Sequence, residues 1–298
     1  MRRKRILAAA LAAVLAAPLG LAGFGSSVKA ENRNHERYYY DQLDADAKGI
    51  YDAMYEMYEK EIFKTGTQEY DLVANGHITS DQLAVYEGNQ TAIVKMFGAA
   101  RDAFCSDYPD IFYVDFSSLS INVSEKTVPA ASVSENDTVV YGASLGTGRG
   151  NNYYTQGFAG QSAVESAVQK HENKINTIVQ GAQKQSKSVR EQVIYVNNAI
   201  IEGTVYTSAD GSNEYVRTSY GALVKGESLC EGYARAVKTV LDALGIRSVL
   251  VQGSYRAPDG SDNLHMWNYV QVDGSWYGLD ATANDGMKGG TDSEKYLL

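Results

Sequence analysis

Cysteine, basic clusters and membrane-length apolar runs are scarce in this 298-residue chain, and each scarcity excludes a class of protein. Two cysteines cannot make a disulfide-dense scaffold, although they could form a single bridge. A formal net charge of -9 without a basic cluster argues against a nucleic-acid partner. Beyond residue 30 no run is apolar enough to cross a bilayer, so no membrane partner is expected there.

The first 30 residues, MRRKRILAAALAAVLAAPLGLAGFGSSVKA, have the three parts of an export signal. A basic start precedes an Ala/Leu-rich stretch, and Val28 and Ala30 have the spacing of a signal-peptidase site. An uncleaved membrane anchor is the alternative, which Pro18 and the Gly and Ser residues after Leu21 disfavour. We therefore predict a signal peptide over 1–30 and a secreted or cell-surface protein.

The region 31–161 is predicted to be mainly helical with short strands. Apolar residues recur at helical spacing over about 41–63 and 80–104. Pro109 ends the second helix, and the Ile/Phe/Tyr/Val run after it predicts a strand. Residues 124–161 are rich in Ser, Gly, Asn and Thr, which predicts a long flexible connection.

Two more helices are predicted at the start of the second region, 162–298. Ser162 with Glu165, and Ser188 with Glu191, have capping-box spacing, and each pair opens an apolar stripe. The final KYLL resembles the start of another strand, which suits a domain that continues beyond the chain given.

Three of the four histidines are expected to have no catalytic or metal role. His171 falls on the first of these apolar stripes and is expected in the core. His35 and His77 lie in polar surroundings and are expected to be solvated, because neither has a second His or Cys at metal-ligand spacing. We expect no metal and no cofactor.

The segment GESLCEGYARAVKTVLDALGIRS, residues 226–248, predicts a helix with a cysteine at its mouth. Gly245 followed by an isoleucine is a helix stop signal. Cys230 then lies in or just before the first turn, where unpaired N–H groups and the helix dipole favour the nucleophilic thiolate. Glu227 and Glu231 flank the cysteine and oppose that effect. The apolar stripe of the helix is Ala234, Val237, Leu241 and Leu244.

Asp273-Gly274 lies between two strand-like runs and predicts a β-hairpin. A two-residue turn at this dipeptide places Trp267 opposite Asp280 along the ladder. His265 is then the diagonal neighbour of Asp280 on the same face, about 7–8 Å away at the backbone and within side-chain reach. A three-residue turn with a bulge would shift the register and separate the two side chains.

A cysteine at a helix mouth with a histidine and a carboxylate on a nearby sheet suits nucleophilic catalysis at an acyl carbon. Cys230 would attack, His265 would take the thiol proton and later give it to the leaving group, and Asp280 would orient the imidazole. The backbone N–H of Cys230 is a candidate oxyanion donor, and no second donor can be assigned.

Structural alternatives exist for each of these residues. Taken singly, Cys230 could be a small buried residue, His265 an ordinary strand histidine and Asp280 an acid in a turn. A disulfide between Cys105 and Cys230 would remove the nucleophile. A zinc site made from the three residues lacks the usual short ligand spacings.

Two long runs, SYGALVKGESLCEGYARAVKTVLDALGIRSVLVQG and HMWNYVQVDGSWYGLDAT, closely resemble the core of the transglutaminase-like superfamily, in its bacterial exported branch. The resemblance covers roughly 189–282 and implies a papain-like Cys-His-Asp core. Cys230, His265 and Asp280 fall on its three positions. Nothing in these runs resembles a calcium site.

We therefore predict an exported α+β protein in which the nucleophile helix packs on an antiparallel sheet. The expected activity is cysteine-dependent acyl transfer from peptide or protein amides, with water as the acceptor in a peptidase or amidase. One alternative is a cross-linker of the protein-glutamine gamma-glutamyltransferase type. Another is a catalytically silent module that binds cell-wall or surface polymers. A cell-wall-associated substrate and the oligomeric state are left open.

Overall fold

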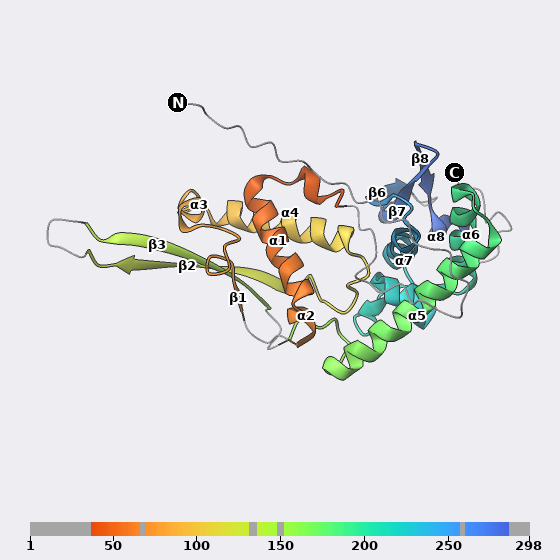
Figure 1. The fold of residues 1–298 in the computed structure, drawn as a ribbon, viewed down its shortest axis with the longest axis horizontal. Coiled ribbons are helices and arrows are strands. Elements are labelled where there is room, and N and C mark those ends of the chain that lie inside the picture. Colours follow the sequence, from red (N-terminus) through yellow and green to blue (C-terminus); the bar gives the residue numbers. More distant parts are fainter. Residues whose placement is uncertain (1–36, 66–68, 131–135, 148–151, 257–259, 286–298) are drawn as a thin grey trace, which may run out of the picture.

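The computed structural model describes residues 37–65, 69–130, 136–147, 152–256 and 260–285, which alternate between helices and short sheets. Figure 1 shows the first helices and sheet at one end of the molecule and the later helices and last sheet at the other. This architecture confirms the predicted α+β class. The helices are α1 (Ala45–Glu59), α2 (Ile62–Thr65), α3 (Ser80–Ala84), α4 (Gln90–Asp107), α5 (Gln161–Gln185), α6 (Val189–Glu202), α7 (Cys230–Leu244) and α8 (Ala281–Asn284). The strands are β1 (Tyr70–Asp71), β2 (Leu119–Val128), β3 (Thr138–Thr147), β4 (Val205–Tyr206), β5 (Glu227–Ser228), β6 (Ser248–Arg256), β7 (Asp262–Val272) and β8 (Ser275–Leu279).

The N-terminal region has its own apolar cluster, built from α1, α4 and an antiparallel sheet of order β1-β3-β2. Asp44 is the N-cap residue of α1, and its carboxylate accepts the backbone N–H of Ala47. The cluster includes Ile50, Met54, Phe63, Phe97, Phe104 and Leu145.

The flexible connection predicted over 124–161 is wrong in its first half, where β2 and β3 pair as an antiparallel hairpin. Most of β2 is exposed, and one end of the hairpin extends beyond the helices (Figure 1). Only this outer end, 126–128 paired with 138–140, is exposed on both faces, whereas Tyr141, Ala143 and Leu145 of β3 are buried in the first cluster. The Ser and Gly residues between the apolar positions make the sequence resemble a loop.

The strand predicted after Pro109 is also wrong. The apolar run there is buried, but its strand pairing is an isolated bridge between Val114 and Tyr154. A short continuous apolar run indicates that a segment is buried, but it has no periodicity that would distinguish a strand from a packed irregular segment. The buried residues of the run are Ile111, Phe112, Tyr113 and Val114.

Some predicted helices differ from the structure in their boundaries, and one differs in its capping. The helix expected over 80–104 is divided into α3 and α4. The helix expected at Ser162 begins earlier, with Gly160 at the N-cap position. Ser188 is the N-cap residue of α6, as predicted, but its side chain makes no capping hydrogen bond.

The second apolar cluster surrounds α7, which packs against α5, α6 and the antiparallel sheet β6-β7-β8. The helix is buried almost all round, including Lys238, whose ammonium donates to both oxygens of Asp242 at 3.0 Å and to the Ser248 carbonyl at 3.1 Å. All three ammonium donors thus have acceptors, as a buried lysine requires. The predicted stop at Gly245 is confirmed, with a left-handed φ of 72°.

α5 contributes to both clusters. Val164 and Ala167 belong to the first, whereas Ile175 and Ile178 belong to the second. The domain boundary predicted at residue 162 stays a prediction, because the helix that begins there joins both cores.

The predicted signal peptide, His35 and the final KYLL lie outside the described residues. Within the described part of the chain, no helix is both long enough and apolar enough to cross a membrane.

A buried carboxylate, Asp107 at the end of α4, holds the segment before α1. It accepts the backbone N–H groups of Tyr39 and Tyr40, each at 3.1 Å, and the Tyr51 hydroxyl at 2.9 Å. The Tyr39 hydroxyl in turn donates to the Leu250 carbonyl of β6. Burial raises the pKa of Asp107 to about 6, because these hydrogen bonds only partly replace water around the charge.

The raised pKa of Asp107 predicts how the destabilisation caused by Asp107→Ala changes with pH. The folded protein binds the carboxyl proton more tightly than the unfolded chain does. The contribution of the protonated Asp107 carboxyl to folding stability is therefore fully present below a pH of about 4. It is lost as the pH rises through about 6, the pKa in the folded protein. Urea unfolding should show that Asp107→Ala lowers the free energy of unfolding more at pH 4.5 than at pH 8, and the two losses should differ by at most about 3 kcal/mol.

Asp102→Ala is the matched control, because Asp102 lies on the same helix with an exposed side chain. Its cost should not vary with pH in this way. An equal cost of Asp107→Ala at both pH values would contradict the burial argument.

Candidate active site

Cys230 is the first residue of α7, with Leu229 at the N-cap position. The helix starts there because the apolar stripe that it buries against the sheet begins within its first two turns. Both Cys105 and Cys230 are free thiols, so the disulfide alternative does not describe this structure.

The turn between β7 and β8 has the predicted geometry. Asp273 and Gly274 have φ values of 50° and 84°, the two left-handed residues of a type I′ turn. The predicted register is confirmed from Val272 opposite Ser275 to Asn268 opposite Leu279. Asp280 leaves the strand one residue later as the N-cap of α8.

His265 and Asp280 meet as this register predicts. His265 Nε2 lies 2.7 Å from Asp280 Oδ2, and Asp280 Oδ1 accepts the backbone N–H of Ala283 at 3.0 Å. The carboxylate is therefore held by the imidazole on one side and by a helix start on the other. The His265 side chain is 14% exposed, so little water competes for the pair.

The pKa of His265 is raised to about 9. The hydrogen bond to Asp280 is the largest cause and a hydrogen bond with the Cys230 side chain is the next, while burial opposes both. The structure thus brings the three predicted residues together. With Nε2 facing the carboxylate, Nδ1 is the ring nitrogen able to exchange a proton with Cys230.

Trp267 packs against this histidine. The two ring centroids are 5.9 Å apart and the ring planes differ by 21°. The indole fits because Gly253 of β6 has no side chain, and a Cβ there would lie 2.8 Å from a ring carbon of Trp267. Sequence reasoning placed Trp267 on the face of His265 but missed Gly253, whose pairing with His265 follows from the β6–β7 register.

Two further side chains connect α7 with its surroundings and were assigned no role from the sequence. The buried Asn268 amide donates to the Ala234 carbonyl at 3.0 Å, which links the histidine strand to the cysteine helix. The Tyr233 hydroxyl lies 2.6 Å from Asp285 Oδ2 and 3.2 Å from the Thr204 carbonyl. Asn268 and Tyr233 both lie inside the two sequence runs that resemble the family. That resemblance is the feature of the sequence that could have identified them.

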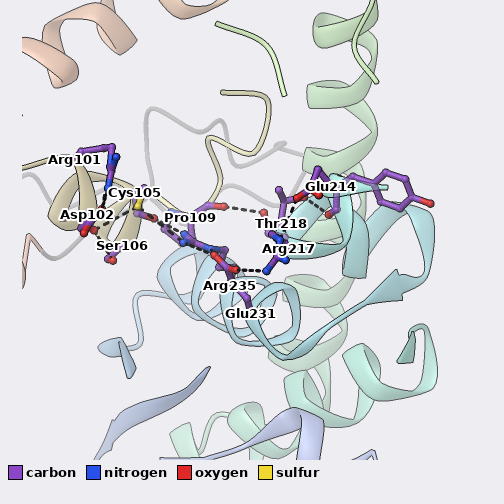
Figure 2. Close-up of polar contacts among 12 residues, drawn as sticks. Arg101, Asp102, Cys105, Ser106, Pro109, Glu214, Arg217, Thr218, Glu231 and Arg235 are labelled. Carbon is purple, nitrogen blue, oxygen red and sulfur yellow. Dashed lines mark hydrogen bonds and ion pairs between the residues drawn. The ribbon is translucent and has the colours of Figure 1, made fainter. Parts of the chain in front are cut away.

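The charge of Glu231, expected to oppose the thiolate, is balanced by two arginines. Arg235 donates twice to Glu231 Oε1, and Arg217 lies 3.7 Å from Glu231 Oε2. Arg235 also donates to the Cys105 carbonyl at 2.6 Å, in the last turn of α4 (Figure 2). Glu227, the other flanking acid, accepts the Tyr215 hydroxyl at 2.9 Å.

The other described histidines lie elsewhere. His171 is buried and packs on Phe112, with ring centroids 4.7 Å apart, as expected of a core residue. The prediction that His77 is solvated is wrong, because its Nε2 lies 2.7 Å from Glu56 and 3.2 Å from the Tyr70 hydroxyl. Among the described residues, no group of three His, Cys, Asp or Glu side chains could hold a metal ion.

Comparison with known protein families finds one match, within the second region. Residues 172–281 match the family model of the transglutaminase-like superfamily. A search of curated proteins found no match. The match covers residues 172–281 and does not extend to the N-terminal region.

Several solved structures are similar at low identity. A TGase structure has a TM-score of 0.36 at 17% identity, covering 59% of this chain and 47% of its own, so this chain spans about half of that protein. A Cytophaga hutchinsonii protein described as a putative cysteine protease has a TM-score of 0.31 at 14% identity, covering 55% and 64%. The periplasmic domain of TgpA from Pseudomonas aeruginosa has a TM-score of 0.28 at 14% identity, covering 56% and 66%.

Removing the carboxylate should lower the pKa of His265. Because the hydrogen bond to Asp280 is the largest cause of the raised value, Asp280→Asn should move the pKa from about 9 toward the ordinary value of about 6.5. Imidazole resonances followed by NMR during a pH titration measure the shift, and His265→Gln assigns the signal.

Asp262→Asn is the control, because it removes an exposed carboxylate from the same strand. It should leave the titration of His265 in place. A His265 pKa that does not change in Asp280→Asn would show that the carboxylate does not control the imidazole.

Proposed function

Because residues 172–281 form a transglutaminase-like domain, we propose that the protein is a cysteine-dependent acyl-transfer enzyme acting on peptide or protein amides. The observation that carries this proposal is the 2.7 Å contact between His265 and Asp280, with Cys230 hydrogen-bonded to the same imidazole at the start of α7. The imidazole thus contacts the proposed nucleophile on one side and the proposed orienting carboxylate on the other, which is the arrangement that amide cleavage needs.

In the proposed reaction, the Cys230 sulfur attacks the amide carbon after its proton has passed to His265. The C–N bond then breaks, and the departing amine takes that proton from the imidazolium. The product is a thioester on Cys230, and the developing oxyanion faces the start of α7, where the Cys230 N–H is a candidate donor. Asp280 stays ionised throughout and stabilises the charged imidazole.

Hydrolysis completes the proposed cycle. Water adds to the thioester, the C–S bond breaks, and the carboxylic acid leaves with the thiol restored. A peptidase or amidase is the preferred assignment, because the described part of the site shows no feature that would keep water away from the thioester. A lysine amine in place of water would make the protein a cross-linker, and this stays the second candidate.

The place of action is proposed from the sequence. Residues 1–30 have the composition of an export signal, so we place the enzyme outside the cytoplasm, secreted or at the cell surface. Its substrates would then be peptides or proteins met there.

Alkylation tests the proposed pair directly. His265→Ala should slow the reaction of Cys230 with iodoacetamide at pH 7 by about tenfold or more, because the imidazole no longer holds the thiol proton. Peptide mapping separates label on Cys230 from label on Cys105. His77→Ala, which removes a histidine bound to Glu56 instead, should leave the rate unchanged. Equal rates in the wild type and His265→Ala would favour the non-catalytic binding module.

Product analysis separates the two acyl acceptors. With a glutamine-containing peptide and an added primary amine, hydrolysis releases the free carboxylate, whereas transamidation gives the substituted amide. We expect the carboxylate, and activity should decline as the pH rises through about 9, where His265 loses the proton that the leaving amine needs. The substituted amide as the main product would replace the hydrolase assignment by the cross-linker.

A further inference from the structure

The short helix α8 carries the candidate carboxylate at its start. It has four residues, with Asp280 at the N-cap position and Asp285 at the C-cap position. The first turn of any helix fixes several residues for one hydrogen bond, so a helix of this length gains little stability from its own backbone. The position of the Asp280 carboxylate must therefore depend on the contacts of α8 with its neighbours, among them α6 and α7 (Figure 1).

Side-chain hydrogen bonds fasten the far end of α8 to both of these helices. The buried Asn284 amide donates to Asn197 Oδ1 on α6 at 3.0 Å. The hydroxyl of Tyr233, on α7, lies 2.6 Å from Asp285 Oδ2. The contact with α7 bears on the candidate site, because Cys230 is the first residue of that helix.

The Tyr233 side chain is a fixed support for Asp285. It is buried, and its ring stacks on Tyr206 with centroids 6.5 Å apart and an interplanar angle of 26°. Its hydroxyl also lies 3.2 Å from the Thr204 carbonyl. A hydroxyl has one proton to donate, and the shorter contact, to a carboxyl oxygen, is the stronger one. Asp285 is therefore the main acceptor.

These contacts close a ring through the candidate site. His265 is hydrogen-bonded both to Cys230 and to Asp280. α8 connects Asp280 with Asp285. Tyr233 then joins Asp285 to the first turn of the cysteine helix. The carboxylate and the nucleophile are thus held relative to the same helix, so a movement of α8 away from α7 would lengthen the 2.7 Å contact between imidazole and carboxylate.

We propose that Tyr233 and Asp285 are positioning residues that hold the Asp280 carboxylate against the imidazole of the candidate site. The assignment rests on the proposed function, because it concerns the same imidazole and carboxylate, and it adds two residues that act through Asp280. Without the contact between Tyr233 and Asp285, α8 would shift or fray. The imidazolium would then lose part of the stabilisation that the carboxylate provides.

Two replacements of Asp285 test the hydrogen bond. Asp285→Ala removes the acceptor, and the pKa of His265 should fall from about 9 to about 8 or less. Asp285→Asn removes the same charge but keeps a side-chain oxygen that can accept from the Tyr233 hydroxyl, so the pKa of His265 should stay near its wild-type value. NMR titration of the imidazole resonances measures both values.

Tyr233→Phe tests the donor. It keeps the buried ring and removes only the hydroxyl, so the pKa of His265 should fall as in Asp285→Ala. Tyr86→Phe is the matched control, because the Tyr86 hydroxyl donates to Asp46 at 2.7 Å in the N-terminal region. Urea unfolding measures the stability that each variant loses. Any loss in Tyr86→Phe should leave the pKa of His265 unchanged.

The titrations separate the positioning role from simpler effects. Equal falls in Asp285→Ala and Asp285→Asn would assign the change to the lost charge and overturn the positioning role. An unchanged pKa of His265 in Asp285→Ala and Tyr233→Phe, with a lowered one in Asp280→Asn, would also overturn it and leave the proposed function standing.

The proposed function can fail separately. If alkylation of Cys230 does not depend on His265, the protein is not the proposed enzyme. The titrations require no activity and still decide whether α8 is held in place by Tyr233 and Asp285. A fall in the pKa of His265 in Asp285→Ala that does not occur in Asp285→Asn would support the positioning role, and the absence of any fall would overturn it.

Discussion

The left-handed backbone at Asp273 and Gly274 is the constraint on which the candidate site depends. Because side chains alternate along a strand, the two-residue turn decides which residues of β7 and β8 share a face. A slip of one residue would move His265 and Asp280 to opposite faces. The 2.7 Å contact between them, and with it the raised pKa of His265, follows from the turn.

The second constraint is the position of α7, which carries Cys230 at one end and Gly245 beyond the other. Asn268 connects its backbone to the histidine strand, and the buried pair of Lys238 and Asp242 connects it to β6. Buried ion pairs of this kind contribute little net stability, because desolvation offsets the attraction between the charges. Their effect here is to hold the cysteine helix in one place on the sheet.

The N-terminal region is joined to that helix and its domain by polar contacts. Arg235 binds the Cys105 carbonyl at the end of α4, and the Ser219 hydroxyl donates to the Pro109 carbonyl at 2.9 Å. The hydroxyl of Tyr39 reaches β6. Carbonyl groups near a helix end lack partners within the helix, so a guanidinium on a neighbouring element is a favourable partner. These contacts hold the N-terminal region against α7 and β6.

Local chemistry by itself determined the helix stop at Gly245, the turn at Asp273-Gly274 and the register between β7 and β8, because each depends on a few adjacent residues. The sequence also identified Cys230, His265 and Asp280 as candidates, because strand periodicity relates two of them and a helix start locates the third. Tertiary structure alone decided what surrounds them. The outer end of the hairpin β2–β3, 126–128 with 138–140, is exposed on both faces, and Phe112 in the run after Pro109 packs on His171 and Tyr220, far away in the chain. Glu231 pairs with Arg235 one turn later on the same helix, a spacing that the sequence shows, whereas the contact of Glu231 with Arg217 and that of Arg235 with the Cys105 carbonyl depend on the folded chain.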